Sequence, residues 1–416
     1  MKKTIAITSA LAAASSLATA EIKINEFLSF SGFVDSSYTH SSNESNGVEG
    51  SDNSFGVDQV EIDWLFNFGK VTAQVDLEYQ GDNNRDNDDG VEVEQAFVNY
   101  DLGNGLTITA GRYESGLGLE AKEPTGLYQY STAYDFGSTN NGGGADDTEF
   151  GDANFLPQYA QGVKLTKVSG DNVYHLSVQD ESFDNDGGRL GGDVTNPRRG
   201  NDDSSYSIEA GASIALSDEL TWFIGGAQED ADTGDTLALD THLVYQTGAW
   251  TFGGEIAYLD SDADRFSNTP NANTVSEAAV FALGAAEAPG ANITIDGGSI
   301  DYSDSEAIQA MVMANYAYSD CCSVTARISY HDSETTGSGT ATSTGATDPL
   351  DDFTGEAFSG TVDLEYLKYT LAHNYAVTDN LAIITEISYI DGDASAGGQD
   401  ADYEALVGAV EVLFTF

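Results

Sequence analysis

The chain has little cysteine, proline or positive charge, and it has no long apolar run after its N-terminal segment. Its 416 residues include only two cysteines, the adjacent Cys321 and Cys322, which are too few for a disulfide scaffold and have no zinc-site spacing. Because no stretch of about 18 apolar residues follows the N-terminus, a membrane-spanning helix is excluded. The five histidines are dispersed, and neither HExxH nor GxSxG occurs, so we expect no enzyme.

Basic residues are scarce throughout the chain. The 15 lysines and arginines are set against 69 aspartates and glutamates, which gives a formal net charge of -54. Binding to nucleic acid phosphates requires Lys and Arg, so nucleic acid is excluded as a partner. Acidic surfaces attract cations and repel anions, and cations are therefore expected as partners.

Residues 1–20 have the pattern of a secretory signal peptide. Lys2 and Lys3 form a basic start, residues 5–17 form a short apolar run, and Ala18-Thr19-Ala20 is a small-residue cleavage site. The prediction is a signal peptide over residues 1–20 and a mature chain over residues 21–416. Export implies a location outside the cytoplasm.

Apolar and polar residues alternate through most of the mature chain. Val60, Ile62 and Trp64 share one parity, while Glu61 and Asp63 take the other. Period-two alternation places the two sets on opposite faces of a β-strand. Similar runs occupy residues 71–79, 206–216, 237–246, 250–258, 324–331 and 410–416. Abundant Gly (45), Tyr (21) and Phe (19), with only 6 Pro, suit many strands joined by turns.

The connections between these runs alternate in length. Tight-turn residues form the short ones, at 68–70, 103–105, 169–171, 217–219, 247–249, 319–321 and 378–380. The others are mostly longer and acidic, at 41–53, 81–90, 114–155, 182–203, 231–235, 261–303, 333–360 and 391–401. This order predicts an all-β fold, a transmembrane antiparallel β-barrel of about 16 strands with short periplasmic turns and long external loops. Strands of about 9–14 residues would span a bilayer when tilted.

Two soluble folds also contain alternating strands, but neither fits the connections. A β-sandwich would not keep a strict short and long order over so many strands. A calcium-stabilised β-helix requires a short repeat with glycine and aspartate at fixed spacing, which is missing. The barrel therefore remains the predicted fold.

The inward face of the predicted barrel is polar. It carries mostly acidic side chains: Asp35, Glu61, Asp63, Asp76, Glu78, Glu209, Asp240, His242, Glu255, Arg327, Lys368, Glu386 and Glu411. A closed apolar core could not bury so many carboxylates. A barrel of this size encloses a water-filled channel, so we expect water to hydrate these groups.

Several segments resemble Gram-negative outer-membrane porins. They are the leader, the first strand FLSFSGFVDSSYTH, and a terminal Phe416, which resembles the signal read by the outer-membrane assembly machinery. The stretch ITAGRYESGLGLEAKEPTGLYQYSTAYDF, residues 108–136, is similar to the β-barrel porin-2-like family. This resemblance implies passive diffusion of ions and small hydrophilic solutes, a location in the outer membrane, and a homotrimer.

The resemblance also implies that the third long loop, residues 114–155, folds into the lumen as a constriction. On that loop it assigns Glu114, Glu120, Lys122, Glu123 and Asp135 to the constriction. Arg112 at the loop's base and Lys164, Arg327 and Lys368 on the walls would be the opposing basic groups. Acidic residues dominate both lumen and loops, and rings of charge select ions by sign, so we expect a preference for cations.

Other features leave alternatives open. The acidic strings at 81–90, 184–188 and 260–264 suggest either solvated loops or calcium sites, although none completes an EF-hand. No other cofactor is expected, and divalent cations could also bridge acidic loops to lipopolysaccharide. Residues 274–289 suggest a short helix. Besides a general porin, the sequence allows a substrate-specific channel or a structural barrel whose loops bind surfaces.

Overall fold

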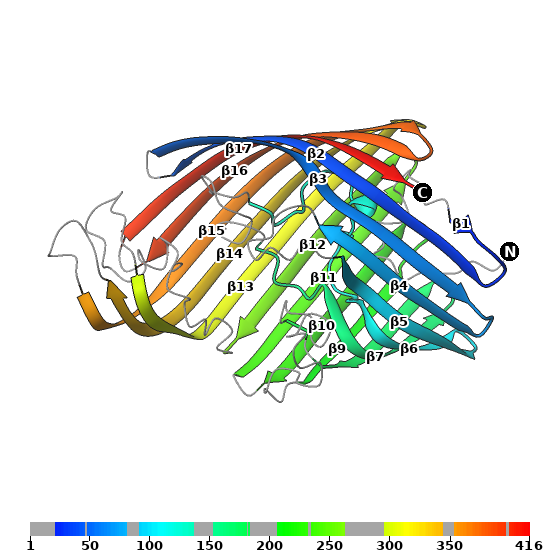
Figure 1. Cartoon of the computed structure of the whole chain (residues 1–416), viewed down its shortest axis with the longest axis horizontal. Coiled ribbons are helices and arrows are strands. Elements are labelled where there is room, and N and C mark those ends of the chain that lie inside the picture. The colour runs from blue at the N-terminus through cyan, green and yellow to red at the C-terminus, as the bar shows by residue number, and fades with distance from the viewer. Residues whose placement is uncertain are drawn as a thin grey trace.

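Consecutive antiparallel strands form one sheet that closes on itself as a barrel (Figure 1). The computed structural model describes residues 21–45, 48–80, 91–136, 153–180, 182–183, 206–231, 234–262, 295–343, 353–396 and 399–416. The sheet has 17 strands, of which β1 is a two-residue piece paired with β2. The remaining strands, β2 to β17, are the sixteen of the barrel, so the predicted fold is confirmed.

The elements follow one another in chain order. They are β1 (Ile22–Lys23), β2 (Leu28–Ser45), β3 (Val48–Asn67), β4 (Val71–Gln80), β5 (Glu92–Gly103), β6 (Leu106–Glu114), the 3-10 turn η1 (Pro124–Gly126), β7 (Tyr159–Ser169), β8 (Asn172–Gln179), β9 (Tyr206–Ala215), β10 (Leu220–Ala231), β11 (Gly234–Thr247), β12 (Trp250–Ser261), β13 (Ile295–Ser319), β14 (Cys322–Ser343), β15 (Phe353–Thr378), β16 (Leu381–Ala396) and β17 (Gln399–Thr415). Within the described residues, no helix has the length and hydrophobicity needed to cross a bilayer.

The last strand closes the barrel against the first long one. β17 pairs with β2 from Thr415 opposite Phe33 to Tyr403 opposite Ser45. Phe416 extends this pairing, because its backbone N–H and C=O both bond to Gly32 at 2.9 Å. Closure pairs β2 and β17 with each other, so neither is left as a free edge strand along this seam.

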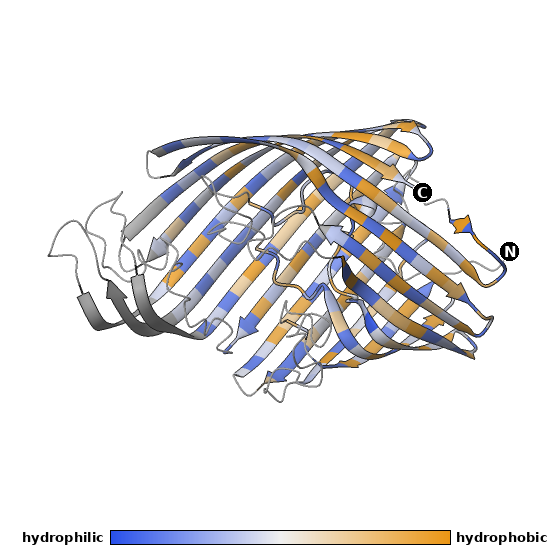
Figure 2. Cartoon of the chain, viewed as in Figure 1, coloured by the Kyte–Doolittle hydropathy of each residue, from blue (hydrophilic) through white to orange (hydrophobic). Residues whose placement is uncertain are grey.

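The two faces of the barrel follow the alternation in the sequence. On β17, Val410, Val412 and Phe414 are 43%, 42% and 44% exposed on the outside, whereas Glu411 and Thr415 are buried on the inside. Figure 2 shows apolar residues concentrated toward the end of the barrel that carries the short turns, and more polar strands toward the other end. The apolar region is the surface that a lipid bilayer would cover.

Several strands are longer than expected, and this corrects part of the connection pattern. The predicted long loops at 41–53 and 391–401 are wrong, because those residues extend the β2–β3 and β16–β17 hairpins. The connection at 231–235 is also short, since only two residues separate β10 from β11. β13, β14 and β15 reach 25, 22 and 26 residues, well beyond the expected length. Polar residues can continue a strand by backbone pairing alone, and they carry no apolar alternation to reveal it.

Other expectations fall on different parts of the chain. The short turns lie where the sequence placed them, and the cysteines at the β13–β14 turn are free thiols. The expected helix at 274–289 and the acidic strings at 81–90 and 184–188 lie outside the described residues, as does the end of the string at 260–264.

The lipid-facing surface allows a direct test at Val312, which is 58% exposed on β13. We expect Val312→Arg to lower the free energy of unfolding by about 2 kcal/mol, because a charge on the lipid face costs about 2–4 kcal/mol at mid-bilayer. Urea titration in lipid vesicles, followed by tryptophan fluorescence, measures the change. Leu102→Arg, at the turn end of β5, is the control at the bilayer edge and should cost much less. Equal costs at the two positions would contradict the assigned membrane span.

Candidate functional site

The chain between β6 and β7 turns into the barrel. Residues 115–136, here called the inner loop, contact inward side chains of strands from β2 round to β16 (Figure 1). Their backbone N–H groups cannot join the sheet, so they need other acceptors. Wall carboxylates provide these acceptors at three successive anchors.

The first anchor is Glu209 on β9. Its two carboxylate oxygens accept hydrogen bonds from the Ser115 hydroxyl at 2.7 Å and the Gly116 N–H at 2.9 Å. The His175 ring nitrogen lies 3.1 Å from the same carboxylate. Glu209 is fully buried, so these donors replace the water that the sequence analysis had assigned to it.

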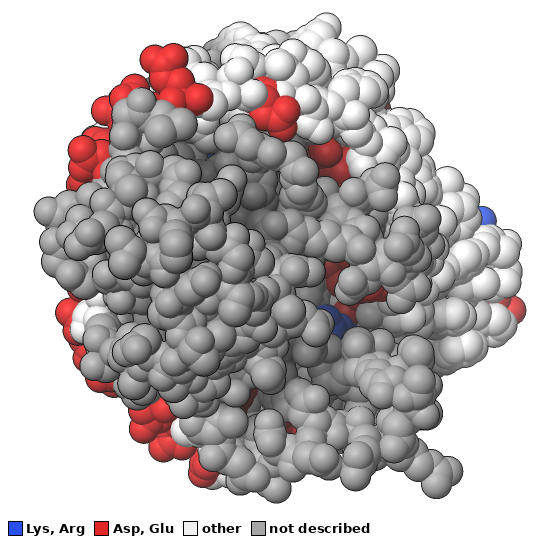
Figure 3. Space-filling view, turned by 60° about the vertical axis from the view of Figure 1, so that its left-hand side comes forward, with Lys and Arg blue, Asp and Glu red and all other residues white. Residues whose placement is uncertain are grey.

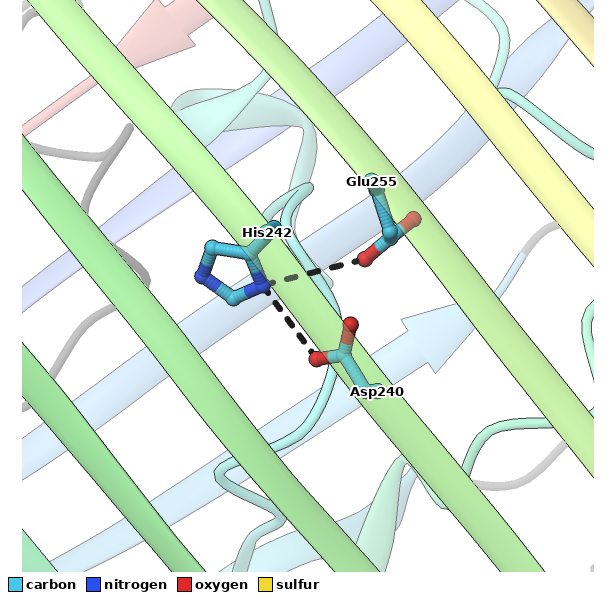
Figure 4. Close-up of side chains that lie close together, drawn as sticks. All are labelled: Asp240, His242 and Glu255. Atoms are coloured by element: carbon cyan, nitrogen blue, oxygen red, sulfur yellow. Dashed lines mark hydrogen bonds and ion pairs between the residues drawn. The ribbon is translucent and has the colours of Figure 1, made fainter.

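The second anchor joins β11 and β12 to the loop (Figure 4). Asp240 accepts the Gly118 N–H at 2.8 Å, and Glu255 accepts the Leu119 N–H at 2.5 Å. His242 Nδ1 lies 3.2 Å from Asp240 and 4.0 Å from Glu255. These three groups could hold a metal ion by spacing, but the oxygens nearest the imidazole already accept loop N–H groups. The cluster therefore acts as a clamp on the inner loop.

Tyr134 completes the clamp from the far side of the inner loop. Its hydroxyl donates to the second oxygen of Glu255 at 3.0 Å. Burial and the neighbouring carboxylate raise the pKa of Tyr134 well above its ordinary value. The phenol therefore keeps its proton and remains a donor at physiological pH.

The third anchor brings basic wall residues onto the loop. Arg327 on β14 pairs with Glu120 at 2.5 Å and donates to the Thr132 carbonyl at 2.8 Å. Lys368 on β15 donates to the Ser131 hydroxyl at 2.7 Å and to the Asp135 carbonyl at 2.5 Å. Both basic side chains are only 1% exposed.

Glu386 on β16 completes the third anchor. It accepts the Ser131 N–H at 3.0 Å and the Ser131 hydroxyl at 2.5 Å. The peptide around Ser131 is therefore bound by an acidic and a basic wall residue at once, which fixes its position on the wall.

Apolar contacts also hold the loop, and the sequence analysis missed them. Leu119 and Phe136 pack in a buried cluster with Met311 and Met313 of β13, and the Phe136 ring stacks on Tyr366 at 4.9 Å. The signal was present in the run Met311-Val312-Met313, because consecutive apolar residues indicate a strand that is covered on both faces.

Glycines let the loop approach the wall near its first anchor. Gly211 and Gly225 are directly paired across β9 and β10. A Cβ at Gly225 would lie 2.8 Å from the Leu117 side chain, and one at Gly211 would lie 2.4 Å from the His175 ring. Larger residues there would displace these side chains.

The structure brings together only some of the residues assigned to the constriction. Glu120, Arg327 and Lys368 meet at the third anchor, where the loop covers both basic groups. Lys122 donates to the Leu117 carbonyl at 3.2 Å, within the inner loop. Glu123 lies elsewhere, against β3 and β7, and accepts from Gln59 and Tyr159.

The remaining assigned residues lie at the base of the loop and at its far end. Lys164 donates to the Glu114 carbonyl at 2.9 Å and lies over the Tyr113 ring. Arg112 donates to the Glu94 carbonyl at 2.7 Å. Asp135 contacts Lys368 through its carbonyl. The assigned basic groups on the wall therefore lie on separate parts of the barrel, Arg112 and Lys164 on β6 and β7, and Arg327 and Lys368 on β14 and β15. They do not form one continuous row of positive charge along the channel.

Comparison with known proteins agrees with the barrel. Residues 28–141 match the family described as "Putative beta-barrel porin-2, OmpL-like". The outer membrane channel DcaP of Acinetobacter baumannii has the same fold, with a TM-score of 0.52 and 12% identity over 94% of this chain and 97% of that one. This chain resembles outer-membrane porins.

A second porin-like comparison structure is outer-membrane expressed OmpT of Vibrio cholerae. It has a TM-score of 0.49 and 12% identity over 95% of this chain and 100% of that one. No curated protein matches the sequence. At 12% identity the DcaP structure establishes the fold alone, and the porin-like residues 28–141 include all of the inner loop.

The third anchor predicts the effect of removing Arg327. We expect Arg327→Met to free the inner loop, because losing one partner of a buried ion pair costs about 3–5 kcal/mol. Trypsin should then cut after Lys122 within the intact barrel, and single-channel conductance should rise. Lys70→Met, which removes an exposed lysine at a short turn, should leave both unchanged. An unaltered cleavage rate in Arg327→Met would mean that this ion pair does not hold the loop.

Proposed function

We propose that this protein is an outer-membrane porin through which ions and small hydrophilic solutes diffuse passively. The observation that carries the proposal is a closed barrel with an apolar outer belt and a loop anchored inside it. A loop that is anchored to the barrel wall narrows the channel, and because the anchors hold it in place it does not move to close the channel. We propose that the protein lies in the outer membrane, where it contacts lipid and lipopolysaccharide. We also propose that it assembles as a homotrimer.

The fate of the basic residues supports a preference for cations. Arg327 and Lys368 are buried under the inner loop, where Arg327 pairs with Glu120 and Lys368 donates to loop carbonyls. They therefore present little positive charge to a passing ion. Among the described residues, by contrast, acidic side chains gather around the rim at the long-loop end, and few described Lys or Arg atoms show there (Figure 3). Such a rim raises the local concentration of cations.

Ion selectivity is measured by the zero-current potential of the reconstituted protein across a planar bilayer with a KCl gradient. We expect the sign of a potassium-permeable channel. The potential should fall when both solutions are raised from 0.1 M to 1 M KCl at a constant ratio, because the Debye length shrinks from about 10 Å to about 3 Å. A potential that favours chloride would overturn the cation preference, and a folded barrel without conductance would overturn the porin.

The exported form gives a separate check. If residues 1–20 are removed on export, N-terminal sequencing of the protein from outer-membrane fractions should begin Glu21-Ile22-Lys23. Replacing Ala18 and Ala20 by bulky residues should leave a longer precursor, because the cleavage site requires small side chains. A mature protein that still starts at Met1 would contradict the proposed export route.

A further inference from the structure

Three carboxylates form a second cluster on the inward face of β3 and β4, away from the three anchors. Asp63 on β3 is directly opposite Asp76 on β4, and Glu61 is two residues from Asp63 on the same face. Oxygens of all three lie within 4.8 Å of one another. Like charges directly opposite each other destabilise a sheet unless a cation or proton compensates them.

Glu61 and Asp76 are buried, Asp63 is half-buried, and each of the three has one oxygen without a donor. Glu61 is 4% exposed and Asp76 is 0% exposed. The buried atoms Glu61 Oε2, Asp63 Oδ1 and Asp76 Oδ1 have no hydrogen-bond partner in the structure. None of the three residues forms an ion pair with a described Lys, Arg or His. Buried carboxylate oxygens without a donor cost free energy unless a cation or a proton meets them.

Neighbouring side chains hold the other oxygens of the cluster. The Ser31 hydroxyl donates to Asp63 Oδ2 at 2.9 Å, and the Gln74 amide donates to Asp76 Oδ2 at 2.9 Å. Each aspartate is therefore held through one oxygen, which leaves its Oδ1 without a donor. Outer hydrogen bonds of this kind orient the ligands in metal sites.

We propose that Glu61, Asp63 and Asp76 bind a calcium ion inside the barrel. Calcium takes six to eight oxygen ligands at 2.3–2.6 Å, so oxygens within 4.8 Å of one another can share one ion. Water completes the shell. Without a nitrogen or sulfur ligand, the site favours a hard cation over zinc or copper.

The inner loop lies beside this site. Glu61 also groups with Glu94 and Glu123 at metal-ligand spacing. Glu123 belongs to the inner loop and is held by Gln59 at 2.9 Å and by Tyr159 at 2.8 Å. A calcium ion bound to Glu61, Asp63 and Asp76 offsets two of the three ligand charges and so lowers the repulsion between Glu61 and Glu123 at this edge of the loop.

The test is calorimetric titration with CaCl2 of the full barrel, folded in detergent and stripped with EDTA. The wild-type protein should bind one calcium ion more tightly than any other, and excess MgCl2 should not displace it. Asp63→Asn/Asp76→Asn should abolish that binding. Glu44→Gln/Glu49→Gln removes an equal charge from an exposed, directly opposed pair on β2 and β3, and it should retain the ion.

A milder variant covers the case in which the double substitution fails to fold. Ser31→Ala keeps every ligand but removes the donor to Asp63, so its affinity for calcium should fall by roughly 10–100-fold. Absence of a saturable calcium site in the wild-type protein would overturn the inference. So would equal loss in the Glu44/Glu49 control, since binding would then lie on the surface acids. Conductance is measured separately, so failure here leaves the proposed channel standing.

Discussion

Inside this barrel a buried carboxylate is stabilised by a donor, a cation or a proton that meets it, and the path of the inner loop follows from that constraint. Glu209, Glu255 and Glu386 each accept a backbone N–H of the loop. The loop in turn has no sheet partner for those N–H groups. Each side therefore meets the other's need for hydrogen bonds, and the loop is fixed to the wall at several points around the lumen.

The same constraint decides which charges remain for a passing ion. By residue type, Arg327 and Lys368 count as positive charges on the channel wall. Both are buried, however, and bond to oxygens of the inner loop, so a passing ion does not contact them. The acidic side chains of the described rim residues, by contrast, are visible at the surface (Figure 3). The selectivity of the proposed channel would therefore depend on which charges the packing leaves uncovered, and net charge alone does not give it.

The sequence predicted the parts of the fold that rest on local pattern. Period-two alternation located the strands and their faces, and tight-turn residues located the short connections. It failed at residues 41–53 and 391–401, because those polar hairpins are held by backbone pairing that no apolar residue marks. The sequence also did not predict the loop anchors, because the two residues of each anchor lie between 93 and 255 positions apart and no local pattern links them. Only Met311-Val312-Met313 gave a readable signal of the covered inner wall.

The contrast between Glu255 and Glu61 shows why position within the barrel matters more than residue type. Both are inward glutamates on neighbouring-strand clusters of acids, and both are 4% exposed. The loop reaches Glu255 with the Leu119 N–H and the Tyr134 hydroxyl, so its charge is solvated by fixed dipoles. At Glu61 the loop presents Glu123, another acid, within ligand distance. The donors Ser31 and Gln74 reach only one oxygen of each aspartate, so the cluster keeps charge that the loop does not solvate. The proposed calcium ion supplies the missing positive charge, and the placement of the loop thus decides where the barrel wall binds a cation.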